Sequence, residues 1–131
     1  AGKLLQRLGL EEQADKRVNR YSGGMKRRAN IIASLLHHPE ILILDEPTAG
    51  VDVQSRAMIL EFLKEYKQQG KTILYTSHLL DEAENICDEV AIIDEGKFII
   101  TGTPEQLIND TPDCRKLEDV FLHYTGHSVR D

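Results

Sequence analysis

The sequence predicts an α/β protein in which a parallel sheet is flanked by helices. Two short apolar runs, at residues 41–44 and 72–76, are separated by a segment with helical periodicity. The first run consists of Ile and Leu without polar alternation, which is typical of a strand buried on both faces of a parallel sheet. Both runs end in polar residues, and open parallel sheets place ligands at the carboxyl ends of their strands. A functional site is therefore expected where these strands end.

Composition and charge limit the classes of function. The chain has 131 residues, of which 40% are hydrophobic and 29% charged, enough for one compact domain with its own core. A formal charge of −6 argues against a nucleic-acid-binding surface, which is usually basic. The printed sequence contains neither an apolar run of about 18 residues nor a signal-like start. Cys87 and Cys114 lack metal-binding spacing and are interpreted as reduced thiols. These features predict a cytoplasmic protein that reaches a membrane only through a partner.

The segment before the first strand is predicted to be helical. Residues 3–8 and 10–18 form two short pieces, the second with acidic residues first and basic residues last, as the helix dipole favours. Ser22 can cap the next helix with its hydroxyl, and Pro39 follows its end. Four residues at helical spacing are expected to form the apolar face of that helix: Ala29, Ile32, Ala33 and Leu36.

Residues 22–24, Ser-Gly-Gly, allow two interpretations. They can be an ordinary N-cap and tight turn. They can also bind phosphate, because glycines let an anion approach backbone N–H groups at the positive end of the helix dipole. The basic residues 26–28 that follow are interpreted as a solvated helix face.

Two adjacent carboxylates end the first strand. Side chains alternate along a strand, so Asp45 and Glu46 are expected to point to opposite sides, where one can hold a metal and the other can handle a proton. Pro47 cannot continue the ladder and opens a loop over residues 48–52. Asp52 can cap the next helix, whose apolar face is Met58, Ile59, Phe62, Leu63 and Tyr66.

The second strand and the segments after it complete the predicted fold. Residues 72–76 lead into Ser77 and His78, although a lone histidine is usually structural or exposed. Residues 79–88 are predicted to form a helix with its acidic residues outward. Residues 90–93 and 97–101 are predicted to form a hairpin, and Pro104 starts a helix through residue 108. A last helix is expected from the spacing of Leu117, Val120, Phe121 and Tyr124.

Four pieces of sequence, in this order, resemble the ATP-binding cassette (ABC) ATPases. They are SGGMKRR at residues 22–28, ILILDEP at 41–47, TAGVD at 48–52, and Ser77 with His78. They correspond to the signature loop, the Walker B segment, the D-loop and the H-loop. Tyr21 and Met25 replace the leucine and glutamine commoner in the signature. SGGMKRR and the tail LEDVFLHYTG look like the ATPases of ABC-2-type and drug-resistance exporters.

The resemblance implies part of a P-loop NTPase (RecA-like) fold with part of the ABC helical subdomain. Residues 1–38 correspond to the end of that subdomain with the signature loop and helix. Residues 39–103 correspond to a remnant of the RecA-like core, and residues 104–131 to a C-terminal helical tail.

The resemblance also implies a role for each site residue. Asp45 is expected to hold Mg²⁺, Glu46 to polarise the attacking water, and His78 to contact the γ-phosphate of ATP. Mg²⁺ prefers oxygen ligands, and phosphoryl transfer needs an oriented nucleophile, which explains the demand for carboxylates. The residues implied to reach the ATP of a second, opposite subunit are Ser22, Gly23, Gly24, Met25 and Asp52.

Two motifs of the family are missing from the sequence. It contains no GxxxxGK[ST] phosphate loop (Walker A) and no glutamine loop. We therefore expect this chain alone to be inactive, and the chain to be the C-terminal part of a larger enzyme. In the family, the strand that feeds the phosphate loop lies between the strands at residues 72–76 and 90–93. Without it, exposed strand edges are expected to favour self-association.

The leading interpretation is a fragment of the ATP-hydrolysing subunit of an exporter. Its implied partners are a membrane-spanning permease and a second ATP-binding subunit, at the cytoplasmic face of the cell membrane, with no nucleic acid. One alternative is a non-transport ABC ATPase acting on ribosomes or DNA, which the acidic charge and the absence of a long heptad segment disfavour. Another is a catalytically silent module that lends its signature loop to a complete partner.

Overall fold

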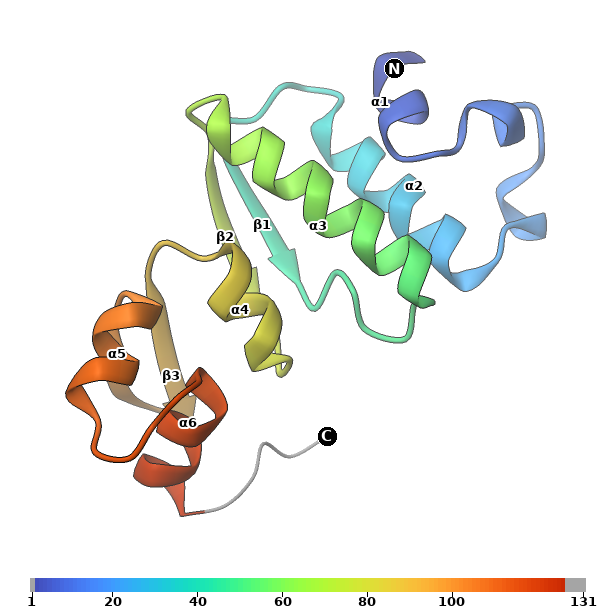
Figure 1. Ribbon diagram of the computed structural model, residues 1–131. Helices are drawn as coiled ribbons and strands as arrows, with labels where there is room; N and C mark the ends of the chain where they lie inside the picture. Colours follow the sequence, from blue (N-terminus) through green and yellow to red (C-terminus); the bar gives the residue numbers. More distant parts are fainter. Residues whose placement is uncertain (1, 127–131) are drawn as a thin grey trace. The chain divides into compact units, whose positions relative to one another are not determined.

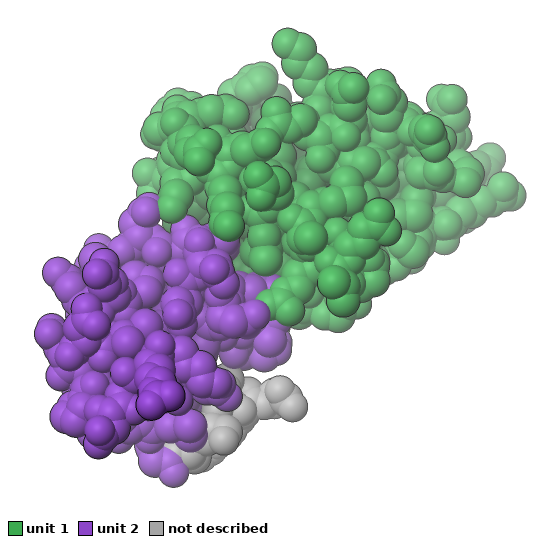
Figure 2. Space-filling view, viewed as in Figure 1, with its two compact units in different colours: residues 1–76 green, residues 77–131 purple. Residues whose placement is uncertain are grey.

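A computed structural model describes residues 2–126 of the chain. These residues form two compact units, unit 1 up to residue 76 and unit 2 from residue 77 onward (Figure 2). The boundary falls within the predicted middle segment, residues 39–103. The predicted C-terminal tail extends past residue 126, and its last residues lie outside the described part. Each described strand belongs to one of two sheets, the pair β1–β2 in unit 1 and the pair β3–β4 in unit 2 (Figure 1).

Unit 1 begins with α1 (Gly2–Arg7), followed by two single 3-10 turns, η1 (Glu11–Gln13) and η2 (Val18–Arg20). The prediction of a continuous helical piece over residues 10–18 is therefore wrong. Between Leu10 and Val18 the sequence is polar except for Ala14, so no apolar face is available to pack a helix. Isolated helices of this length are unstable without such packing.

The helix α2 (Gly23–Leu35) starts where the sequence predicts. Its N-cap is Ser22, whose Oγ accepts a hydrogen bond from the Met25 N–H at 3.2 Å. The predicted apolar face is partly wrong, because Ala33 and Leu36 are exposed. The buried positions of α2 are instead Gly24, Ile31, Ile32 and Leu35. Gly24, Ile31 and Leu35 are spaced at i, i+7 and i+11, so they form one stripe along α2, as in a helix that packs along a neighbouring helix.

The strands β1 (Ile41–Asp45) and β2 (Thr72–Thr76) pair in parallel, as predicted, with Ile43 opposite Leu74. The predicted burial of β1 on both faces is wrong. Leu42 and Leu44 are buried, whereas Ile41, Ile43 and Leu74 are 62%, 68% and 57% exposed. The reason is that the described part of unit 1 covers one face of this sheet only, so alternate side chains reach solvent.

The long helix α3 (Val53–Gln68) packs against α2 and β2 (Figure 1). Asp52 caps it, as predicted, and Gly70 follows its end with a left-handed φ of 81°. Tyr66 donates from its hydroxyl to the Pro39 carbonyl at 2.7 Å, which ties the end of α3 to the start of β1. Most of the predicted apolar face is buried, namely Ile59, Phe62, Leu63 and Tyr66.

Unit 2 contains α4 (Leu80–Ile86), the antiparallel hairpin β3 (Val90–Asp94) and β4 (Lys97–Gly102), α5 (Pro104–Asp110) and α6 (Leu117–Thr125). The hairpin and the proline at the start of α5 confirm the predictions. The core of this unit consists of Ala83, Ile92, Leu107, Leu117, Val120 and Phe121.

The prediction that the acidic residues of α4 point outward is wrong at Glu82. Its side chain is 1% exposed, and its Oε2 lies 3.4 Å from the Ser77 Oγ. Glu82 stands four residues before Ile86 and next to Ala83, so it shares their buried face. A buried carboxylate is retained only where polar groups compensate it, and the Ser77 hydroxyl is one of these.

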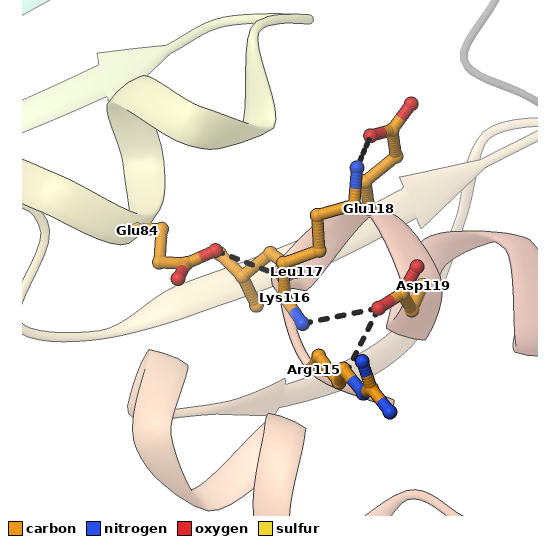
Figure 3. Close-up of polar contacts among 6 residues, drawn as sticks. All are labelled: Glu84, Arg115, Lys116, Leu117, Glu118 and Asp119. Carbon is orange, nitrogen blue, oxygen red and sulfur yellow. Dashed lines mark hydrogen bonds and ion pairs between the residues drawn. The ribbon is translucent and has the colours of Figure 1, made fainter. Parts of the chain in front are cut away.

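A carboxylate of α4 also holds the start of α6 (Figure 3). Glu84 Oε2 accepts a hydrogen bond from the Leu117 N–H at 3.0 Å. Asp119 Oδ2 accepts from the backbone N–H groups of Arg115 at 2.9 Å and Lys116 at 3.2 Å, and Lys116 forms an ion pair with Glu118. These carboxylates satisfy N–H groups that have no partner within the helix itself.

Candidate functional site

Asp45 and Glu46 lie at the carboxyl end of β1, where both contact Thr76, the last residue of β2. Thr76 Oγ1 donates a short hydrogen bond to Asp45 Oδ1. The Glu46 N–H donates to the Thr76 carbonyl oxygen at 3.0 Å and also lies 3.2 Å from Thr76 Oγ1. Thr76 therefore fixes both acidic residues. No sequence motif marks Thr76, and its place at the end of the second strand is the one signal in the sequence that points to it.

The backbone of Glu46 leaves the extended conformation. Its φ is 43°, in the left-handed region that non-glycine residues rarely adopt. The expectation that Asp45 and Glu46 point to opposite sides assumed an extended strand at both positions, and this assumption is wrong at Glu46. A left-handed residue of this kind costs roughly 1–2 kcal/mol and is often found at functional sites.

The loop over residues 48–52 is held by its own polar contacts. Thr48 is buried, and its Oγ1 lies 3.3 Å from the Tyr75 hydroxyl. Asp52 Oδ1 accepts from the Ser55 N–H and Asp52 Oδ2 from the Ser55 hydroxyl, both at 2.8 Å. These two hydrogen bonds, with the charge of Arg28 as a smaller contribution, hold the pKa of Asp52 below its ordinary value. The N-cap interpretation of Asp52 is confirmed.

The start of α2 lies beside this loop. Gly23, Lys26, Arg27 and Asn30 of α2 line a hollow of about 250 Å³ together with residues 49–51. The residues that line it carry positive charge from Lys26 and Arg27 and, within the described part of the chain, include no carboxylate. The N-cap interpretation of Ser22 is also confirmed. The second interpretation of residues 22–24, that they contact a phosphate, stays a prediction. The positive charge beside them favours it.

His78 belongs to unit 2, in the segment between β2 and α4, and is half-buried. The preceding residue shapes this segment, because Ser77 Oγ accepts a hydrogen bond from the Leu79 N–H at 3.0 Å. The expected contact of His78 with a phosphate stays a prediction.

The end of β1 fits a magnesium ion that is held by few protein ligands. Residues 2–126 contain no group of three or more His, Cys, Asp or Glu side chains that could hold a metal by themselves. Mg²⁺ does not need such a group, because it usually binds one or two carboxylates and takes its other ligands from phosphates and water. Asp45 is exposed at the strand end, so its carboxylate fits this mode.

The chain was compared with known protein families and curated proteins. The model of the family described as "ABC transporter" matches residues 1–49. The linearmycin resistance ATP-binding protein LnrL of Bacillus subtilis (strain 168) is 50% identical over 132 residues, which covers 100% of this chain and 40% of the relative. The Nod factor export ATP-binding protein I of Ralstonia nicotianae is 44% identical over 115 residues, which covers 88% of this chain and 36% of the relative. The chain thus spans less than half the length of these curated relatives.

Two solved structures are similar to most of this chain. The ATP-binding subunit of an ABC transporter superimposes with a TM-score of 0.82 and 29% identity, covering 94% of this chain and 52% of that one. A nucleotide-free ATP-binding cassette from an ABC transporter superimposes with a TM-score of 0.74 and 29% identity, covering 86% and 46%. Within residues 2–126, the helices are all too short or too polar to cross a membrane.

Proposed function

The chain belongs to the ABC transporter family and forms part of its ATP-binding domain, which has the P-loop NTPase fold; from this premise, we propose that it supplies half of an ATP-hydrolysing site in an exporter. The complete subunit would bind and hydrolyse ATP at the interface of two ATP-binding subunits. This chain would contribute the acidic residues of one site and the signature loop of the other.

The observation that carries this proposal is the fixed pair of acidic residues at the end of β1. Thr76 holds the carboxylate of Asp45 and the backbone of Glu46. In the proposed site Asp45 holds Mg²⁺, which when bound neutralises charge on the phosphates. Glu46 orients the attacking water and accepts its proton, and His78 contacts the γ-phosphate.

The start of α2 is proposed to face the ATP of the partner subunit. The first N–H groups of a helix, which have no partner within the helix backbone, and the helix dipole favour an anion there. The 13 residues of α2 and the cations Lys26 and Arg27 support this role. The residues assigned to it are Ser22, Gly23, Gly24 and Met25, with Asp52 from the adjacent loop.

The printed names of the relatives concern resistance to linearmycin and export of Nod factors. Members of this family bind ATP, and ATP-binding subunits of exporters pair with a membrane permease and with each other. We propose that this chain is part of the ATP-binding subunit of an ABC-2-type exporter, and that this subunit lies at the cytoplasmic face of the membrane. The assignment of residues 1–38, 39–103 and 104–131 to helical subdomain, RecA-like core and tail is part of the same proposal.

The test is Glu46→Gln in the full-length subunit assembled with its permease. This change removes the proton acceptor but keeps the size of the side chain, so ATP turnover should fall about 10²-fold to 10⁴-fold. ATP binding should persist. The matched control is Glu61→Gln on the exposed face of α3, which should leave turnover unchanged. Full turnover after Glu46→Gln would rule the proposal out.

A further inference from the structure

The two glycines at the start of α2 meet different surroundings. A Cβ atom on Gly24 would lie 2.5 Å from Ser55 Oγ, 2.9 Å from Asp52 Oδ2 and 3.0 Å from Ser55 Cβ. A Cβ atom on Gly23 would have none of the described residues within 4 Å. Gly24 is buried inside the helix, so its requirement for glycine comes from the close approach of α3 rather than from an unusual φ.

Ser55 cannot easily give way to a larger side chain at position 24. It is 3% exposed, and both its N–H and its hydroxyl donate to the carboxylate of Asp52 at 2.8 Å. Rotating the hydroxyl away would break one of these bonds inside a packed contact. The cap of α3 therefore forms a rigid surface on which the first turn of α2 rests.

Arg28, four residues after Gly24 and therefore on the same face of α2, adds to this contact. Its Nε donates to the Gly24 carbonyl oxygen at 3.4 Å, and its guanidinium also donates to the Leu8 carbonyl oxygen at 2.7 Å. The positive charge of Arg28 also favours the carboxylate form of Asp52. The start of α2 is thus held by both Arg28 and the Asp52–Ser55 pair.

We propose that Ser55 is a positioning residue that joins the signature loop, residues 22–25, to the loop at residues 48–52 as one rigid body. The inference rests on the proposed function, in which both segments face the ATP of the partner subunit. Because Ser55 and Gly24 are in direct contact, neither segment can shift without moving the other. The chain would therefore present the signature loop and Asp52 to the partner site together.

The test is a double-mutant cycle on the full-length subunit assembled with its permease. Gly24→Ala should lower kcat about a hundredfold, the scale expected when a catalytic group is displaced by about 1 Å. Ser55→Gly removes both atoms of Ser55 that the new Cβ would meet, and it frees Asp52 Oδ2, the third close atom, from its bond to the Ser55 hydroxyl. Adding it to Gly24→Ala should therefore restore kcat about tenfold. If the double variant is no more active than Gly24→Ala, the contact does not position the loop and the proposal is overturned.

Binding must be measured separately from turnover. The signature loop acts on the nucleotide of the partner, so Gly24→Ala should lower kcat while ATP binding by the isolated full-length subunit stays unchanged. A loss of binding as large as the loss of kcat would show a general folding defect and overturn the positioning role. The matched control is Ser34→Ala, which loses the hydroxyl bond to the Ile31 carbonyl oxygen on the same helix and should leave kcat unchanged.

A second measurement covers the case in which Gly24→Ala fails to assemble. Ser55→Ala keeps the Cβ atom and the N–H bond to Asp52 and loses only the hydroxyl bond to Asp52. Amide hydrogen exchange at Met25 should therefore accelerate about tenfold, while Ser34→Ala should not change it. Unchanged exchange at Met25 would overturn the inference. Failure of the proposed function looks different, because wild-type turnover would then be absent or insensitive to Glu46→Gln, whereas exchange at Met25 would still respond to Ser55.

Discussion

The left-handed backbone of Glu46 yields a prediction whose size follows from the structure. Replacing Glu46 with Ala or with Gly removes the carboxylate and its stem in both cases, so the two variants differ only in the Cβ methyl group and in the backbone conformations that it restricts. At a φ of 43°, Ala pays roughly 1–2 kcal/mol that Gly does not pay. Gly loses roughly 0.5–1 kcal/mol more conformational entropy on folding. Glu46→Gly should therefore be about 0.5–1 kcal/mol more stable than Glu46→Ala.

Urea unfolding of the full-length subunit measures this difference. The midpoint should be higher for Glu46→Gly than for Glu46→Ala at an unchanged slope, since the surface exposed on unfolding is the same. In a thermal scan the difference corresponds to about 1–4 °C for a domain of this class. Both variants should lack ATP turnover, because neither carries the carboxylate.

The exposed Glu61 in the middle of α3 is the matched control. There the backbone is right-handed helix, so Glu61→Ala should be more stable than Glu61→Gly by about 1 kcal/mol, the opposite order. If Glu46→Ala proved as stable as Glu46→Gly while the control behaved as expected, Glu46 would not be left-handed in solution. The strain argument would then fail.

Three further predictions concern the packing and charges of the two units. Ile59→Ala should lower the free energy of unfolding by about 2–5 kcal/mol in urea titrations, because Ile59 is fully buried, and a loss below about 1 kcal/mol would contradict that packing. Glu84→Ala should cost about 0.5–2 kcal/mol and speed hydrogen exchange at the Leu117 amide, and an unchanged exchange rate would show that Glu84 does not hold α6. The lowered pKa of Asp52 means that its contribution to stability is complete above the ordinary aspartate pKa of about 3.9 and is lost as pH falls through the lower folded value. Unfolding midpoints should therefore drop across that acid range, and Ser55→Ala should weaken the drop, whereas an identical pH profile for both proteins would refute the assignment.

Much of the fold could be predicted because its signals are local. Ser22, Asp52 and Thr103 each cap the helix that follows, as their short polar side chains favour. The turn at Glu95 and Gly96 joins two strands within one hairpin. The parallel pairing of β1 with β2 follows from two apolar runs with a helix between them.

The errors arose where a side chain is buried or exposed by distant parts of the chain. Glu82 looks like a surface residue of an acidic helix, yet the helix turns it inward. Ile43 looks like a core residue, yet the described part of unit 1 covers only the other face of its sheet. Periodicity identifies a face of a helix or strand, but the surroundings decide which face is buried.

The same difference between local signals and long-range contacts applies to the candidate site. The roles of the residues at the end of β1 and at the start of α2 could be predicted from the sequence, because caps, turns and strand ends depend on neighbours a few positions away. The bond between Thr76 and Asp45, 31 positions apart, and the contact of Ser55 with Gly24 emerge only when the chain is folded. Such contacts join segments whose meeting depends on the packing of whole helices and strands, and no local pattern encodes that packing.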